Sequence, residues 1–354
     1  MREKWSCEKA WDWYNSKKWI VGCNYIPSDC ISYLEIWQEY EFDKKLETMN
    51  RELKLAADTG MNSVRMFFPF QVWKYQRKGF LERIETFLDM AQKYGITMMA
   101  VFFDDCCGPK EHYGKATFGR QPDPTPGYHG GFPPAKFNEE PPIGYQVMDV
   151  EEEEENILEY VRDIVSKFKD DQRIIVWDIL NEPGNSNRGS KSMKKMEAVF
   201  ELIRSINPIQ PLTADAWSFP DGKLNFNNDI MEIEKRALEL SDVITYHFYG
   251  DYDNSVKVIE QLKKYNRPMI ITEWLHRPFG NNVETHLPLF KREKIGCYNW
   301  GLVAGKTQTY EPWESIRNIP GLDLSKWQHD LFHADLSPYD QKEIDIFKKL
   351  TLDR

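Results

Sequence analysis

Two glutamates end apolar segments that have the character of buried strands. Glu182 closes "VWDILNE" (residues 176–182) and Glu273 closes "MIITE" (residues 269–273). Two carboxyl groups that face each other over a cleft can cleave a glycosidic bond, since a protonated one donates to the leaving oxygen while an ionised one attacks or activates water. A lone glutamate of this kind would be explained by a salt bridge. The pair predicts catalysis if the fold brings both residues to one cleft.

Polar residues also end the other apolar segments. They are Arg65, Asp104, Asp105, Asn181, Asp215, Trp217, His247, Tyr249, Asn299 and Trp300. Ionisable groups at the ends of apolar strands are costly unless they converge on one polar pocket. We expect Arg65 and Tyr249 to lie near Glu273 and hold it ionised. Glu182, sheltered beside Trp177 or Trp217, would stay protonated.

The elements that must position these residues alternate along the whole chain. Amphipathic stretches such as residues 42–60, 80–95 and 255–266 separate eight short strand candidates. The strand candidates are residues 19–26, 62–70, 96–105, 174–182, 211–217, 242–250, 268–274 and 296–302. Eight strand-helix units predict an α/β fold, a (β/α)₈ TIM barrel whose active site lies at the C-terminal ends of the strands. An open doubly wound sheet is the alternative, but no G-x-G-x-x-G follows the first strand.

The chain lacks a Pro/Ser-rich linker, so we predict one catalytic domain over residues 1–354, with residues 1–18 as an N-terminal lead-in. Two long irregular segments, residues 106–148 and 303–339, follow the third and eighth strands. Loops of this length are usually functional or disordered, and these would lie on the active face. Both could wall a substrate cleft and close one of its ends, which favours action on chain ends or short oligosaccharides.

The composition limits the partners. The 354 residues carry a net charge of -10, which argues against nucleic acid, because binding a polyphosphate relies on Lys and Arg. Aromatic residues make up 14%, including 12 Trp, which suits a neutral carbohydrate as well as ordinary core packing. Apolar runs are too short to span a membrane, and no signal-peptide core is seen. We therefore expect a soluble monomer or weak homo-oligomer, cytoplasmic as given, or periplasmic or secreted if a signal was removed.

Six cysteines without a C-x-x-C pair indicate neither a disulfide scaffold nor a zinc site. No cofactor or metal is expected. The adjacent Cys106 and Cys107 have no role that the sequence assigns.

The sequence resembles the retaining glycoside hydrolases of clan A, most closely the cellulase and mannanase group of family 5. The resemblance extends from "GCNYIPS" to "GCYNWGLVAGKTQT" and is carried by five features. These are "NEP" at residues 181–183, "ITEW" at residues 271–274, "HFY" at residues 247–249, Arg65 within "NSVRMFF", and Trp300. One barrel hosts many specificities, so a β-linked xylan, mannan or glucan is the expected substrate class.

The resemblance implies that Glu182 is the acid/base, Glu273 the nucleophile, and Asn181 the donor to the sugar 2-hydroxyl. It also places Trp300 at the floor of the subsite where the bond breaks. Together with the strand-end positions, it leads us to expect a set of substrate-binding residues. This set is Arg65, Asp105, Asn181, Trp217, His247, Tyr249 and Trp300.

Two alternatives remain. Asp104, Asp105, Cys107 and His112 lie close together in sequence and could hold a divalent metal in a barrel hydrolase or isomerase, although no H-x-H or H-E-x-x-H spacing is present. The other alternative is a catalytically inactive carbohydrate-binding barrel, in which sugar binding would not depend on Glu182. The sugar, the linkage and the oligomeric state are not fixed by the sequence.

Overall fold

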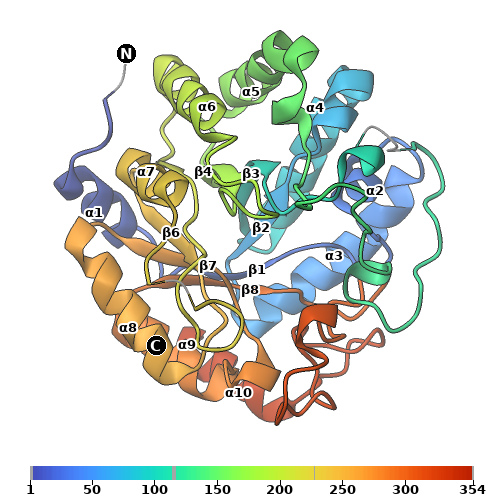
Figure 1. Cartoon of the computed structure of the whole chain (residues 1–354), viewed down its shortest axis with the longest axis vertical. Coiled ribbons are helices and arrows are strands. Elements are labelled where there is room, and N and C mark those ends of the chain that lie inside the picture. Colours follow the sequence, from blue (N-terminus) through green and yellow to red (C-terminus); the bar gives the residue numbers. More distant parts are fainter. Residues whose placement is uncertain (1–2, 114–116, 227, 353–354) are drawn as a thin grey trace.

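A computed structural model describes residues 3–113, 117–226 and 228–352, which form one (β/α)₈ barrel (Figure 1). All eight predicted strands are confirmed and all are parallel to their neighbours. They are β1 Val21–Asn24, β2 Ser63–Phe67, β3 Thr97–Asp104, β4 Ile174–Asn181, β5 Leu212–Thr213, β6 Ile244–His247, β7 Met269–Trp274 and β8 Gly296–Trp300. The sheet order is β5-β4-β3-β2-β1-β8-β7-β6.

The short strand β5 marks where the barrel closes. Only two residues of the predicted segment 211–217 join the β4 ladder. Beyond them the chain turns to β6, where Ala216 forms a parallel bridge with Tyr246. Closure at this point leaves Asp215 and Trp217 beside the end of β4. They lie at the upper rim, by which we mean the edge of the barrel at which the strands end.

Helices surround the sheet in Figure 1. They are α1 Cys7–Asn15, α2 Tyr33–Trp37, α3 Phe42–Thr59, α4 Phe70–Lys93, α5 Glu154–Phe168, α6 Met193–Ile206, α7 Glu232–Leu240, α8 Tyr252–Leu262, α9 Val283–Arg292 and α10 Gln341–Thr351. Short 3₁₀ helices cover Lys110–His112, His129–Gly131, Val147–Asp149, Glu151–Glu153, Lys263–Tyr265, Arg277–Phe279 and Glu314–Ile316. The predicted segment 42–60 is α3, which ends where Gly60 takes a left-handed φ of 97°.

Helix α1 closes the lower end of the barrel. Trp5 N donates to Asp242, just before β6, and Trp11 Nε1 donates to the carbonyl of Asn266, just before β7. Tyr14 and Ile20 belong to a small buried cluster of barrel residues that includes Met99, Val176, Ile270 and Tyr298. The lower interior is therefore apolar, and the lead-in segment covers it.

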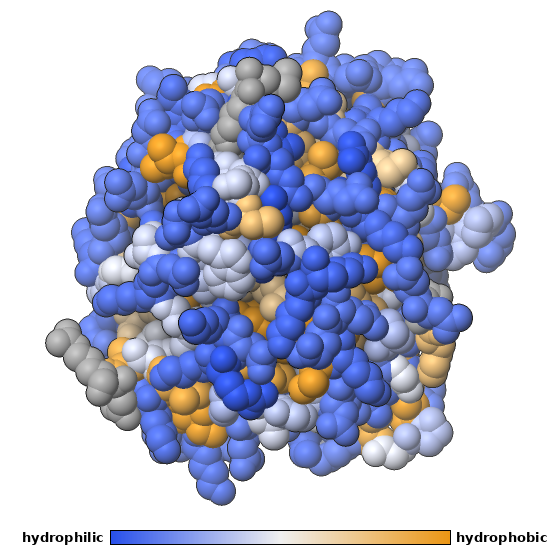
Figure 2. All heavy atoms as spheres, turned by 90° about the vertical axis from the view of Figure 1, so that its left-hand side faces the viewer, coloured by the Kyte–Doolittle hydropathy of each residue, from blue (hydrophilic) through white to orange (hydrophobic). Residues whose placement is uncertain are grey.

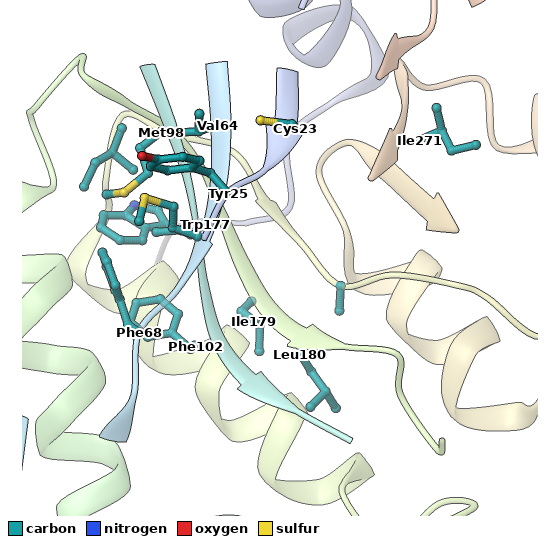
Figure 3. Packing of buried hydrophobic residues seen from close by; sticks show 14 of the residues in the cluster. Cys23, Tyr25, Val64, Phe68, Met98, Phe102, Trp177, Ile179, Leu180 and Ile271 are labelled. Carbon is teal, nitrogen blue, oxygen red and sulfur yellow. The ribbon is translucent and has the colours of Figure 1, made fainter. Parts of the chain in front are cut away.

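The main core lies between the sheet and the helices. Figure 3 shows Trp177 from β4 packed near Phe68, Phe102 and Met98. The rings of Trp177 and Phe102 stack with their centroids 5.5 Å apart. Trp177 thus lies on the outer face of the barrel, so the expectation that it shelters Glu182 is wrong.

The two long loops meet over one side of the upper rim. Gln308 accepts from Gly127 N and donates to the carbonyl of Thr125, while Nδ1 of His129 lies 2.9 Å from the carbonyl of Glu311. The segments run side by side at the right of Figure 1. The two loops therefore form one connected wall beside the upper rim.

The molecular surface is polar in the view of Figure 2, where hydrophobic residues are scattered among hydrophilic ones. In the part of the chain that the structure describes, no helix has both the length and the hydrophobicity to cross a membrane.

Candidate active site

Arg65 on β2 lies at the centre of the upper barrel and is completely buried. Its guanidinium donates to Asp178 at 2.8 and 3.0 Å and to Asn24 at 2.9 Å. It also reaches Asn181 at 2.8 Å, Asp215 at 2.9 Å and Glu273 at 3.2 Å. One side chain thus joins residues of β1, β4, β7 and the segment after β5.

Glu273 near the end of β7 accepts two hydrogen bonds from polar neighbours. Arg65 donates to Oε1, and the Tyr249 hydroxyl donates to Oε2 at 2.7 Å. Burial raises the pKa of Glu273 above its ordinary range, and the nearby Glu182 adds to this, while His247, Arg65 and Tyr249 oppose it. The predicted neighbours Arg65 and Tyr249 are therefore in place and favour the ionised form of Glu273, although burial is the larger effect on its pKa.

Glu182 immediately follows β4 and has a left-handed φ of 46°. Such a conformation is strained for a residue with a side chain, and strain of this kind is concentrated at functional sites. Its Oε1 lies 2.9 Å from His247 Nδ1, and Asn185 Nδ2 donates to its Oε2. One carboxylate oxygen of Glu182, one of Glu273 and a ring nitrogen of His247 all lie within 4.8 Å of one another.

His247 at the end of β6 lies between the carboxyl groups. Its Nδ1 is 3.5 Å from Glu273, and its Nε2 is 3.3 Å from Asp215, at an angle too bent for a hydrogen bond. Burial opposes a charged imidazole, but Glu273, Asp215 and Glu182 outweigh it and hold the pKa of His247 well above its ordinary value. For Asp215, Arg65 and His247 outweigh burial and hold its pKa below the usual range. Arg65 and His247 thus both lie among the carboxyl groups of the site.

A cavity of about 1160 Å³ opens above these residues. That is slightly larger than most small-molecule sites. Among the predicted residues, Asn181, Glu182, Trp217, His247, Tyr249, Glu273 and Trp300 line it. Trp217 is fixed by a hydrogen bond from its indole N–H to the carbonyl of Pro183. The structure thus brings both predicted catalytic glutamates and five of the seven predicted substrate-binding residues to one cavity.

Two predicted substrate-binding residues do not line this cavity. Arg65 lies beneath it, and its five N–H groups are already used by protein acceptors. We therefore correct its assignment from substrate contact to positioning of carboxyl groups.

Asp105 is also buried away from the cavity, and it requires the same correction. Its carboxylate is paired with Arg188 at 2.6 Å and accepts from Gly184 N and Ser192 Oγ at 2.7 Å. Gly184 has a φ of 84° and follows the "NEP" segment. Asp105 therefore fixes the turn that carries Glu182 rather than contacting a sugar.

The sequence did not fix three features of the site: which of two adjacent aspartates lines the cavity, the presence of Asp178, and which loop residues form the wall. Asp104, rather than Asp105, lines the cavity, and Asp178 contributes a carboxyl group from the middle of β4. The loops add His129 and Trp313 to the cavity wall, and the Trp313 ring centroid lies 5.0 Å from that of Tyr249. Because neighbouring strand residues point to opposite faces, only one of two adjacent aspartates could face the cavity. Contacts between the loops had no signal in the sequence.

The metal alternative can be compared with this geometry. The predicted ligand set is not gathered, since Asp105 is paired with Arg188. Among the described residues, the cluster with suitable ligand spacing is Glu182, His247 and Glu273. Arg65 is bonded to this cluster through Glu273, and its positive charge opposes a bound cation.

Comparisons with known proteins agree with the fold. A family model described as Cellulase (glycosyl hydrolase family 5) matches residues 35–306. A GH5_18 protein from Streptomyces cattleya, an E153A form in complex with Manb1-4GlcNAc, matches with a TM-score of 0.58 and 13% identity, covering 95% of this chain and 81% of that one. A beta-1,4-mannanase from the sea hare Aplysia kurodai matches with a TM-score of 0.56 and 13% identity, covering 80% of this chain and 88% of that one.

A third structure is the exo-beta-1,4-mannosidase Op5Man5 from Opitutaceae bacterium strain TAV5. Its TM-score is 0.58 at 15% identity, and the match covers 94% of this chain and 60% of that one.

The Arg65 network generates a prediction about stability. Arg65→Met should lower the free energy of unfolding by about 3–5 kcal/mol, because it leaves buried carboxyl groups without their cation. Arg65→Lys should lower the free energy of unfolding by less, because lysine retains the positive charge. It should still be destabilising, because lysine has three N–H donors rather than five. Urea unfolding measures both. Arg120→Met, at a side chain 76% exposed, is the matched control and should change stability by less than about 0.5 kcal/mol. Equal effects at both arginines would contradict the central role of Arg65.

Proposed function

Because this chain belongs to the cellulase family, glycosyl hydrolase family 5, we propose that Glu182 and Glu273 are its catalytic carboxyl groups. Membership of the family makes the protein an O-glycosyl hydrolase that acts on β-glycosides with retention. The observation that carries the assignment is the approach of one oxygen from each glutamate to within 4.8 Å. Retaining enzymes hold their carboxyl groups about 5–5.5 Å apart, whereas inverting enzymes leave about 6.5–9.5 Å for a water molecule.

The surroundings of the two glutamates support different roles. Glu273 is held from below by Arg65 and from the side by Tyr249, and both donors favour its ionised form. It would attack the anomeric carbon as Glu182 protonates the leaving oxygen, giving a glycosyl ester on Glu273. Glu182 would then take a proton from water, which attacks the same carbon and releases the sugar and the Glu273 carboxylate. The side chain of Glu182 is 12% exposed, compared with 8% for Glu273. This greater exposure suits a group that must contact both the leaving group and water.

For the substrate, we propose exo-acting cleavage of β-1,4-linked mannosides from the non-reducing end. The wall formed by the two long loops supports this, because His129, Trp313 and Ser315 from these loops line one side of the cavity. A chain continuing past the cleaved sugar would meet this wall. The similarity to an exo-beta-1,4-mannosidase and to a protein bound to Manb1-4GlcNAc favours mannose among the possible sugars.

The substrate proposal predicts a product pattern. The enzyme should hydrolyse an aryl β-mannoside faster than the matching β-glucoside and β-xyloside. It should shorten manno-oligosaccharides one sugar at a time, which is measured by chromatography of early products. Mannan viscosity should fall slowly, and EDTA should leave the rate unchanged. A rapid loss of viscosity with mixed oligosaccharides would instead indicate cleavage within the chain, and loss of activity in EDTA would favour a metal enzyme.

The catalytic roles predict two different losses. Glu273→Ala should lower turnover on every substrate by at least about 10⁴-fold, and azide should restore some reaction with inverted product. Glu182→Ala should retain the glycosylation step on an aryl glycoside with a good leaving group, but not on an oligosaccharide. Stopped-flow and steady-state rates separate these cases, with the exposed Glu82→Ala as control. Equal losses on both substrate types in Glu182→Ala would argue against the acid/base role.

The Tyr249 hydrogen bond predicts a change in the pH profile. The nucleophile must be ionised, so kcat/KM should fall as the pH drops through the raised pKa of Glu273. Tyr249→Phe removes a donor that lowers this pKa, so the acidic limb should move about one pH unit higher. Tyr75→Phe, at a residue 67% exposed, should leave the limb in place. An acidic limb that moves to lower pH, or not at all, would contradict this account of Glu273.

A further inference from the structure

A third carboxyl group, Asp104, shares the cavity with the two glutamates. It is the last residue of β3 and is half-buried. Its Oδ1 accepts from Asn181 Nδ2 and from Cys106 N, both at 2.8 Å. Among the described residues, no side chain or backbone group bonds to Oδ2 of Asp104. Since Asp104 lines the cavity, Oδ2 is the oxygen available to a ligand.

Asp104 also lies at a junction. A second cavity of about 330 Å³ adjoins the first, and Tyr33, Phe67 and Asp104 line both. The rings of Tyr33 and Phe67 stack with centroids 4.5 Å apart, so the wall beside Asp104 is aromatic. Aromatic faces flanking one polar group form a suitable surface for a sugar ring and one of its hydroxyls.

The charges around Asp104 differ from those around the other carboxyl groups. Arg65 and His247 are bonded to or paired with Asp178, Asp215, Glu182 and Glu273, whereas neither bonds to Asp104. The titratable groups that interact with Asp104 are Glu182, Glu273, Tyr33, Cys106 and Cys107. Burial and the two glutamates raise the pKa of Asp104 to about 8. At neutral pH most molecules therefore carry a proton there, and Oδ2 is its site because Oδ1 accepts two hydrogen bonds.

We propose that Asp104 is a specificity-determining residue that donates a hydrogen bond from Oδ2 to a ring hydroxyl of the sugar held against Glu273. The proposal rests on the proposed function, because it requires a sugar in this cavity. Among the described residues, only Asp104 accepts from the Asn181 amide, which leaves its second N–H to meet a neighbouring hydroxyl. The two side chains would thus contact adjacent hydroxyls. A site built to bond a hydroxyl discriminates strongly against an analogue that lacks it.

A rival interpretation is that Asp104 only orients Asn181, whose Oδ1 accepts from Arg65 at 2.8 Å. Two variants and a substrate series separate the interpretations. Asp104→Asn keeps an acceptor for Asn181 and Cys106 and presents an N–H donor to the cavity, whereas Asp104→Leu removes both. Asp323→Asn, at a side chain 55% exposed, controls for loss of an aspartate.

The first measurement is kcat/KM at pH 6 on the aryl β-glycoside that the wild type hydrolyses best. Asp104→Leu should lose about 10- to 100-fold, the effect of one buried hydrogen bond, and Asp104→Asn should lose clearly less. Monodeoxy analogues of the same glycoside give the second measurement. The wild type should show large penalties at the two adjacent ring positions that Asn181 and Asp104 contact, and one of these two penalties should fall to about 2-fold or less in Asp104→Leu.

The pH profile gives the third measurement. In a Glu182→Gln background, with a leaving group that needs no proton, an alkaline limb should be present below pH 8, because the substitution removes a charge that raises the pKa of Asp104. It should disappear in Glu182→Gln/Asp104→Asn, because an amide does not titrate.

The outcomes that would overturn the proposal are distinct from a failure of the proposed function. Deoxy penalties that are the same in wild type and Asp104→Leu at every position would show that Asp104 does not contact the sugar. Equal losses in Asp104→Asn and Asp104→Leu would show that a donor on Oδ2 is not needed. In contrast, a wild type that hydrolyses no aryl β-glycoside would contradict the proposed function itself.

Discussion

The burial of one arginine is the constraint on which the site depends. A guanidinium removed from water requires acceptors for all five N–H groups and counter-charges nearby. Arg65 finds them on Asn24, Asp178, Asn181, Asp215 and Glu273. Because these partners come from separate strands, satisfying the arginine fixes the strand ends relative to one another. The same bonds orient Glu273 and Asn181 beneath the cavity.

This arrangement places the carboxyl groups of the site in different electrostatic surroundings, so their pKa values differ. Asp215 lies next to Arg65 and His247, so its pKa falls below the usual range, whereas burial and Asp215 raise the pKa of Asp178. Glu273 is in contact with a cation and yet close to Glu182. Carboxyl groups of one residue type thereby acquire different proton affinities, which is what acid/base chemistry at a single pH requires.

Much of this was predictable from the sequence, because hydrophobic period and strand-end position are local signals. All eight strands and the gathering of Glu182 and Glu273 at one rim follow from them. The choice between Asp104 and Asp105 depends on which of two neighbouring side chains points into the barrel, and the residue types alone do not decide that direction. Arg65 was expected at the end of its strand, whereas it is the middle residue of β2, and its depth in the barrel depends on partners from four other segments. The contact between His129 and Trp313 joins residues that are 184 positions apart in the sequence, so no local sequence signal predicts it.

The placement of α1 separates the two ends of the molecule. The lead-in segment covers the apolar lower interior through bonds from Trp5 and Trp11 to the segments before β6 and β7, while the cavity opens at the opposite rim. An attachment made through the first residues, such as a tether to a solid support or a fused module, would therefore leave the cavity mouth facing solution. Polymeric sugars could still reach Glu182 and Glu273 in the immobilised protein.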